Sequence, residues 1–485
     1  MPTLNKRPPA RTSGIGRREP KFVTGSLVRH ILVMTGTGAL GLVAIFIGDL
    51  ANIYFLSLLG DEAIIAAVGY ASSITLLTIS IGIGLSIAAT AVVSPALGAR
   101  RRGLARRLAG SAHAWTFIVA ALLSLLVFAF LEDLLILLGA SGRTLDLASR
   151  YLAIQVPSMP FLALGMTSAA TLRSVGDASR AMYVTLIGAL TNVALDPLLI
   201  FWAGLGIDGA AIASSVARLA VCAVGLYGVL AVHRMMRRPR LAAMRRDAGA
   251  LARVAVPAIA TNIATPAANA YVTAVIAGYG DSAVAGWAII GRLVPVAFGS
   301  IYALSGNVGP IMGQNYGARR ADRMRETLTL SLMVTAAFTA AAWLVLALAT
   351  PTIIAAFGAE GDAARLISLF CVWLSPLFLF LGALFVANAV FNTLGRAYLS
   401  TALNWGRATL GTAPFVLVGG HLAGADGVLV GNMVGGILFG VVAVALCYRL
   451  IDDLGRGFAV TAPAVAPPPA GIPPDDKAPV LPPAA

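Results

Sequence analysis

Long apolar segments dominate this chain, and many run for about 20 residues or more, enough to cross a hydrocarbon core about 30 Å thick. Of its 485 residues, 58% are hydrophobic and only 12% are charged, about half the charged share of a soluble domain. The apolar segments are continuous rather than alternating, and backbone groups in lipid must be paired within the protein, so α-helices are predicted. The sequence therefore predicts an all-α integral membrane protein with twelve transmembrane helices.

The expected spans are residues 30–58, 62–97, 108–131, 148–172, 181–204, 208–232, 251–278, 282–315, 327–350, 364–393, 399–420 and 427–449. The second and eighth exceed the bilayer minimum, so we expect them to tilt, bend or extend past it. Gly299 and Pro95 are among the candidate bend points.

Basic and acidic residues alternate between successive loops, although the chain as a whole carries a net charge of +14. Most of the 35 Lys and Arg residues fall in the two tails and in every second loop, for example 100–107, 234–253 and 319–325. The intervening loops carry acids such as Asp61 and Asp208. This positive-inside pattern predicts a multi-pass protein of the cytoplasmic (inner) membrane with both termini cytoplasmic. The basic loops are expected to meet anionic membrane lipids rather than nucleic acid.

Short sequence signatures recur after 218 to 220 residues, which indicates an internal duplication. They are Gly60-Asp61 and Gly280-Asp281, Gly98-Ala99-Arg100-Arg101 and Gly317-Ala318-Arg319-Arg320, Leu172 to Gly176 and Phe391 to Gly395, and Ile207-Asp208-Gly209 and Ala425-Asp426-Gly427. The predicted organisation is a disordered basic cytoplasmic tail (1–25), a six-helix lobe (26–233), a cytoplasmic inter-lobe loop (234–250), a second six-helix lobe (251–452) and a disordered Pro/Ala-rich cytoplasmic tail (453–485). Lobes repeated in the same orientation commonly hold their substrate where they meet, and rock against each other.

Two carboxylates stand alone in the predicted spans, Asp49 and Asp196, and both belong to the first lobe. An ionisable residue at bilayer depth is a functional-site hypothesis by default, because burying its charge is costly. Asn52 shares a helix face with Asp49, as Asn192 does with Asp196. Ser214 could add a further oxygen ligand.

We expect these five residues to couple transport to an ion. A desolvated carboxylate could carry a proton, or the clustered oxygens could bind Na⁺ at Asp49, Asn192 and Asp196, and both readings stay open. The purely structural alternatives are a hydrogen bond of Asp196 to Asn192 or to a backbone amide, and a salt bridge of Asp49 with Arg218.

Other polar residues in the spans carry weaker signals. Tyr70, Gln155, Asn262, Trp287 and Arg292 are candidate contacts of a substrate cavity, although packing or interfacial roles explain each of them as well. Three separated cysteines and the lack of a nucleotide-binding or Zn-binding motif predict no cofactor and no enzyme activity.

Several motifs, taken in order, resemble the multidrug and toxic compound extrusion (MATE) transporters. They are Leu59-Gly60, Gly98-Ala99 followed by arginines, Asn192-x-x-x-Asp196-Pro197, Gly204-x-Gly206-x-x-Gly209-Ala210-Ala211 and Pro310 to Ala318. The resemblance implies a V-shaped twelve-helix exporter that exchanges drugs or metabolites for H⁺ or Na⁺, with Asn192, Asp196 and Ser214 at first-lobe cation positions. One departure is that the acid and amide of the first span are exchanged, with Asn52 where the family places its acid and Asp49 one turn earlier.

The favoured reading is an antiporter that exports amphipathic, often cationic, small molecules by alternating access, without an obligatory protein partner. A flippase for a lipid-linked or polar metabolite is the alternative within transporters. A passive channel or a membrane-embedded enzyme is the alternative from other classes.

Overall fold

The computed structural model describes residues 20–460, and all regular secondary structure in this range is helical. Its first half contains α1 (Leu27–Ser57), α2 (Glu62–Gly98), α3 (Arg102–Ala129), α4 (Leu131–Leu137), α5 (Gly142–Gln155), η1 (Val156–Ser158), α6 (Met159–Val175), α7 (Ala178–Pro197), η2 (Leu198–Trp202), α8 (Gly206–Tyr227) and η3 (Gly228–Val232). Its second half contains α9 (Leu241–Ala277), α10 (Asp281–Ala297), α11 (Gly299–Gly317), α12 (Ala321–Phe357), α13 (Gly361–Leu369), η4 (Phe370–Leu374), η5 (Ser375–Leu377), α14 (Phe378–Thr393), α15 (Ala397–Gly406), η6 (Arg407–Gly411) and α16 (Ala413–Val460).

Within the described range, ten helical stretches are long and apolar enough to cross a membrane, and α10 with α11 forms a further span bent by 50°. The stretch Ala397–Phe458 contains two membrane spans, because the backbone of α16 is non-helical at Ala423 and Gly424 and the chain reverses direction there. The two arms of this hairpin touch closely, since a Cβ on Gly427 would lie 1.8 Å from the carbonyl oxygen of Gly419. The predicted twelve spans are therefore confirmed, and the eighth bends beside Gly299, whereas α2 stays continuous through Pro95.

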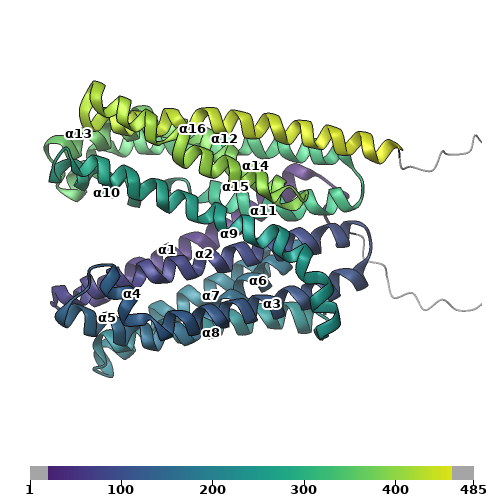
Figure 1. Cartoon of the computed structure of the whole chain (residues 1–485), viewed down its shortest axis with the longest axis horizontal. Helices are drawn as coiled ribbons and strands as arrows, with labels where there is room; N and C mark the ends of the chain where they lie inside the picture. The colour runs from purple at the N-terminus through teal and green to yellow at the C-terminus, as the bar shows by residue number, and fades with distance from the viewer. Residues whose placement is uncertain (1–19, 461–485) are drawn as a thin grey trace, which may run out of the picture.

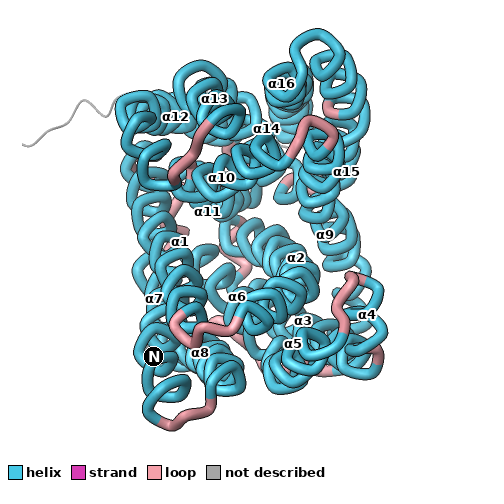
Figure 2. The backbone as a smooth tube through the Cα atoms, turned by 90° about the vertical axis from the view of Figure 1, so that its left-hand side faces the viewer, coloured by secondary structure: helices cyan, strands magenta, loops and turns pink. Residues whose placement is uncertain are grey.

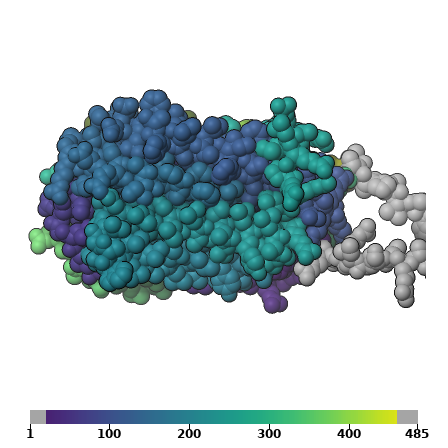
Figure 3. Space-filling model, turned by 90° about the horizontal axis from the view of Figure 1, so that it is seen from below, coloured from purple at the N-terminus to yellow at the C-terminus, as the bar shows by residue number. Residues whose placement is uncertain are grey.

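The helices gather into two lobes, the first made of α1–α8 and the second of α9–α16. Seen from one end of the molecule, the lobes occupy opposite halves of the view (Figure 2). They diverge toward the end opposite the chain termini, and both ends of the described chain lie at the other end (Figure 1). The view from below shows mainly the outer face of the first lobe (Figure 3).

The duplication is visible in the backbone as well as in the sequence. Left-handed φ values occur at Gly60 and Gly280, at Gly176 and Gly395, and at Arg100 and Arg319. The arginines are notable because a non-glycine residue adopts this conformation only at a cost. Equivalent turns thus follow equivalent helices in the two lobes, as the repeated signatures predict.

Backbone-to-backbone packing of α2 on α11 closes the terminus-bearing end. A Cβ on Gly98 would lie 1.9 Å from the carbonyl oxygen of Gln314, and one on Gly317 would lie 1.9 Å from that of Pro95. Gly317 and Gln314 occupy the same repeat positions in the second lobe as Gly98 and Pro95 do in the first. The two close contacts are therefore related by the internal duplication. Only glycine permits such an approach without displacing the partner helix.

The first helix of each lobe crosses to the other lobe at this end. Leu27, Ile31 and Met34 of α1 pack in the hydrophobic core built by α11, α12, α14 and α16. Reciprocally, Asp247 of α9 accepts hydrogen bonds from Arg107 (3.0 Å) and from Ser111 of α3. The prediction of a loop over residues 234–250 is corrected here, because α9 already begins at Leu241 and docks on α3.

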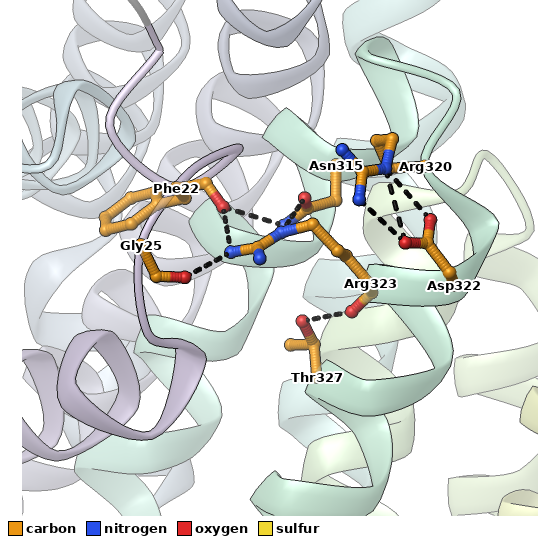
Figure 4. Close-up of polar contacts among 7 residues, drawn as sticks. All are labelled: Phe22, Gly25, Asn315, Arg320, Asp322, Arg323 and Thr327. Carbon is orange, nitrogen blue, oxygen red and sulfur yellow. Dashed lines mark hydrogen bonds and ion pairs between the residues drawn. The ribbon is translucent and has the colours of Figure 1, made fainter.

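The segment before α1 is ordered from residue 20, which corrects the predicted disorder up to residue 25. Phe22 is 1% exposed in the second-lobe core. Its N–H donates to Oε1 of Gln314 (2.9 Å). Its carbonyl accepts from Asn315 (3.2 Å) and Arg323 (3.1 Å), as Figure 4 shows. Arg323 also donates to the carbonyl of Gly25 (3.1 Å). Side chains of α11 and α12 thus hold the backbone of the segment that precedes α1.

At the other terminus, α16 continues to Val460 rather than ending near 452. Its last turns pack on α12, where Ile451 is buried and Arg325 pairs with Asp452. The rest of the two predicted tails, 1–19 and 461–485, lies outside the described residues.

We predict that Gly317→Ala loosens the α2–α11 contact, because the new methyl group would overlap the Pro95 carbonyl. The purified variant should melt at a lower temperature than the parent. Gly306→Ala on the same helix is the matched control, since a Cβ there meets nothing within 4 Å. Equal melting temperatures for the two variants would contradict this account of the contact.

Asp177 ties the start of α7 to the end of the η3 turn. Its carboxylate caps α7 by accepting from the N–H of Arg180 (3.1 Å), and it accepts from Nε2 of His233 (2.7 Å). Partial burial raises the pKa of the Asp177 carboxyl, but the hydrogen bonds from His233 and Arg180 outweigh this and bring the pKa below its ordinary value of 3.8. The ionised form is therefore the one that stabilises the fold.

We predict that Asp177→Asn lowers the melting temperature at neutral pH and that the deficit shrinks under acid. A carboxyl with a depressed native pKa contributes its full stability above the unfolded value and loses it as pH falls through the native value. Melting curves of parent and variant from pH 7 down to the acid range measure this. A deficit that stays constant with pH would show that the ionised carboxylate is not what stabilises the cap.

Candidate functional site

One hydrogen bond joins the two helices that carry the embedded acids. Asn52 of α1 donates from Nδ2 to Oδ2 of Asp196 on α7, at 3.0 Å. Asp196 is 0% exposed and Asn52 only 7%. The second carboxylate oxygen of Asp196, Oδ1, is also buried and has no hydrogen-bond partner among the described residues. The site therefore contains a desolvated carboxylate with one oxygen left to bind a proton or a cation.

Small residues bring α1 and α7 close enough for this bond. Gly48 lies one turn before Asn52, and a Cβ there would already touch Ala189 of α7 at 3.6 Å. Pro197 follows Asp196 directly, and the chain continues into the π-helical turn η2. A proline in a helix removes one hydrogen bond and leaves the carbonyl one turn earlier free. Irregular helix turns of this kind occur often at functional sites.

Asn192 and Ser214 lie next to this pair and connect α7 to α8. The Ser214 hydroxyl donates to Oδ1 of Asn192 at 3.4 Å, and both side chains are half-buried. Asn192 is one helical turn from Asp196, so its amide lies on the same side of α7. The structure thus brings four of the five predicted ion-coupling residues onto adjoining faces of α1, α7 and α8.

Asp49, the fifth, is placed differently from Asp196. Its side chain is exposed rather than buried and makes no hydrogen bond or ion pair within 4 Å to any described residue. It is attracted at longer range by Arg218 of α8. The direct salt bridge between Asp49 and Arg218, considered above as a structural role, is therefore not formed. The residue of α1 that contacts Asp196 is Asn52, through its amide, and not Asp49.

Arg218 anchors a polar network in the interior of the first lobe. Its guanidinium donates from Nη1 to the carbonyl of Gln155 and to the Ser158 hydroxyl, both at 3.1 Å. The Gln155 side chain in turn accepts from Thr75 (3.2 Å) and donates to the Tyr151 hydroxyl (3.1 Å). Sequence reasoning proposed Gln155 as a substrate contact and missed Tyr151 and Thr75. The proline turn η1 is the signal that could have drawn attention to them.

The other predicted cavity residues do not join this network. The Tyr70 hydroxyl donates to the carbonyl of Gly139 (3.4 Å), and Asn262 donates to that of Ala258 one turn earlier (2.8 Å). Trp287 donates to the Thr273 hydroxyl (2.9 Å). Arg292 is exposed on α10. Their role as a common substrate surface remains a prediction.

The site offers oxygen ligands from amides, a hydroxyl and one or two carboxylates. No group of three or more His, Cys, Asp or Glu side chains in the described range could hold a metal ion. A transition-metal centre of clustered acids and imidazoles is therefore not formed there. These oxygen ligands suit a proton or a hard cation.

A bundle of twelve membrane helices arranged as two repeated lobes is the architecture of many membrane transporters. The family model MatE matches residues 26–198 and 257–418. The chain therefore belongs to the MATE family of transporters.

Relatives of known name cover nearly the whole chain. A protein named FAD transporter from Shewanella oneidensis is 30% identical over 439 residues, which is 89% of this chain and 97% of that protein. The multidrug export protein MepA of Staphylococcus haemolyticus is 22% identical over 89% of this chain and 96% of its own length.

Solved structures agree with this assignment. The Vibrio cholerae MATE transporter VcmN in its bent form superposes with a TM-score of 0.82 at 25% identity, over 90% of this chain and 98% of that one. An outward-facing multidrug resistance transporter of the MATE family matches in fold with a TM-score of 0.84 at 20% identity, over 90% and 99% of the two chains.

We predict that Asp49 and Arg218 are energetically coupled in stability. Arg218→Gln should destabilise the protein less in an Asp49→Asn background than in the parent. In the parent background the substitution leaves the Asp49 carboxylate without the cation that attracts it, whereas in the Asp49→Asn background no carboxylate is present at that position. Coupling of about 0.5–3 kcal/mol is usual for residues that interact. Unfolding of the four proteins of this cycle in detergent measures the coupling. Strictly additive effects would show that Asp49 does not sense Arg218.

Proposed function

We propose that this protein is an antiporter that exports amphipathic small molecules across the cytoplasmic membrane in exchange for H⁺ or Na⁺. The observation that carries the proposal is the buried Asp196 carboxylate. Asn52 holds one of its oxygens, and the other has no hydrogen-bond partner within residues 20–460. Such a group is costly to keep ionised without a bound cation. Occupancy by an ion therefore changes the stability of the first lobe around α1, α7 and α8.

Coupling follows if the ion reaches Asp196 from one side only in each state of the transporter. The two lobes are packed together at the terminus-bearing end by α2 and α11 and diverge at the other end (Figure 1). Binding of the ion from the diverging side would favour the conformational change that carries the ion to the other side. The return change would then carry cargo to the diverging side. One charge moving through 100 mV supplies about 2.3 kcal/mol, or a roughly 50-fold cargo gradient.

Asp49 acts in this proposal as a second, more accessible acid. Its exposed carboxylate lies on the same side of α1 as Asn52, one turn away. We propose that it collects the ion and, together with Arg218, sets the electrostatic potential at Asp196. Occupation by Na⁺ would need the oxygens of Asn192 and Asp196, with Asp49 as an added ligand.

The class of cargo is supported from two directions. The relatives named MepA are multidrug export proteins, which supports amphipathic drugs, often cationic, as cargo. The relative named FAD transporter supports a second candidate, the export of a flavin nucleotide. We propose both termini on the cytoplasmic side, from the basic loops, and a single chain as the functional unit.

The test is transport by the purified protein in liposomes, with a proton gradient or a sodium gradient imposed separately. We expect one of the two gradients to drive efflux of a fluorescent amphipathic cation or a flavin. Asp196→Asn should slow that efflux by at least about tenfold, equivalent to ~1.4 kcal/mol, since the amide cannot take up a proton or neutralise a cation. Asp49→Asn should slow it as well.

Asp322→Asn is the matched control, because that acid pairs with Arg320 on the exposed start of α12. It should transport at the parental rate. Gradient-driven efflux that persists in both Asp49→Asn and Asp196→Asn would refute the coupling. Flux without any gradient dependence in the parent would instead indicate a passive channel.

A further inference from the structure

The second lobe buries a cation that pairs with no carboxylate in the described part of the chain. Arg407 begins the π-helical turn η6 that follows α15, and its side chain is only 7% exposed. Its Nη2 donates to the Thr265 hydroxyl of α9 at 3.2 Å. Its Nε is buried without a hydrogen-bond partner among the described residues. The guanidinium is thus held at one nitrogen and left unsatisfied at another.

The acids of the second half, within the described residues, all lie at the ends or reversals of helices. They are Asp247, Asp281, Asp322, Glu326, Glu360, Asp362, Asp426, Asp452 and Asp453. By contrast, Arg218 of the first lobe has two hydrogen-bond acceptors and the nearby charge of Asp49. A buried charge without a countercharge is unfavourable unless a ligand supplies one.

Arg407 lies near the middle of the membrane. It follows Ala397, the start of α15, by about 15 Å at 1.5 Å per residue. Its partner Thr265 precedes Ala277, the opposite end of α9, by about 18 Å on the same measure. This is the depth at which transporters of this architecture hold their cargo between lobes.

The second lobe also contains an aromatic cluster around Tyr302. The phenol of Tyr302 on α11 interacts electrostatically with Arg407. Tyr302 contacts Phe385 with ring centroids 5.3 Å apart and Phe378 at 6.2 Å. The 50° bend between α10 and α11 lies directly before it. An aromatic cluster within electrostatic range of a guanidinium suits a ligand that combines an aromatic ring system with an anionic group.

We propose that Arg407 is the anion-binding residue of a cargo site in the second lobe, with Thr265 and Tyr302 as its polar neighbours, and that the site takes aromatic compounds bearing a phosphate group. This inference rests on the proposed transport function and narrows its cargo class. The forked guanidinium binds phosphate through two parallel hydrogen bonds, for which a free Nε is one of the required donors. The first lobe then carries the acids that bind the coupling ion, and the second carries the cation that binds the cargo.

The test compares riboflavin with flavin mononucleotide, which differ by one phosphate group. Their fluorescence is titrated with the full-length purified protein in lipid nanodiscs, without any ion gradient. We expect the parent to bind the mononucleotide about tenfold or more tightly than riboflavin, the usual size of a charge-assisted hydrogen-bond effect. Equal affinities in the parent would overturn the proposal before any variant is made.

Arg407→Gln should abolish this preference and leave riboflavin affinity within about twofold of the parent. Arg407→Lys keeps the charge but loses the fork, so it should retain part of the preference. Arg396→Gln, at the exposed start of α15, is the control and should bind both flavins as the parent does. A preference that survives in both Arg407 variants, checked by melting temperature for intact folding, would show that Arg407 is a structural residue only.

Failure of this inference and failure of the coupling mechanism are distinguishable. Asp196→Asn should keep the phosphate preference in the binding assay, since no ion gradient is involved. Loss of gradient coupling with an intact preference supports both proposals. An intact preference with unaltered gradient-driven efflux in the acid variants would overturn the coupling alone.

Discussion

Hydrocarbon cannot hydrogen-bond, so each polar group inside the bilayer must find its partner within the protein. The helices satisfy the backbone, and many threonine hydroxyls return to the carbonyl one turn earlier, as Thr335 and Thr339 do. Among the described residues, two ionisable side chains deep within the predicted spans are exceptions to this rule. Oδ1 of Asp196 and Nε of Arg407 are buried without a partner in the described range. The proposed ion site and cargo site are built on these two exceptions.

The two lobes share the same helix packing but differ in their embedded ionisable side chains. Left-handed turns, proline-containing breaks at η1 and η5, and the exchange of close contacts between Gly98 and Gly317 recur at equivalent positions. Among the described residues, the first lobe has embedded acids together with Arg218, whereas the second lobe buries Arg407 without an embedded acid. A duplicated backbone thus supports two different chemistries, because side chains can diverge without altering the helix packing that the glycines set.

Contacts at the terminus-bearing end limit how the lobes can move. The start of α1 and Phe22 are held in the second-lobe core, and the start of α9 is held on α3 through Asp247. Rocking that opens this end must break these crossed contacts together with the α2–α11 packing. Asn52, which donates a hydrogen bond to Asp196, lies on α1, so a change at the ion site acts on a helix that reaches both lobes.

Local pattern in the sequence was enough to determine the membrane class, the twelve spans, the duplication and the helix faces on which Asn52, Asn192 and Asp196 lie. These features follow from apolar length, charge alternation and helical periodicity, which neighbouring residues express. The sequence did not show that Asn52, rather than Asp49, would touch Asp196, because the rotation of α1 depends on its packing against Ala189. Nor did it single out Phe22 or Arg407, whose partners lie far along the chain. Only the tertiary structure decided these points, because burial and the presence or absence of a countercharge depend on which distant helices pack together.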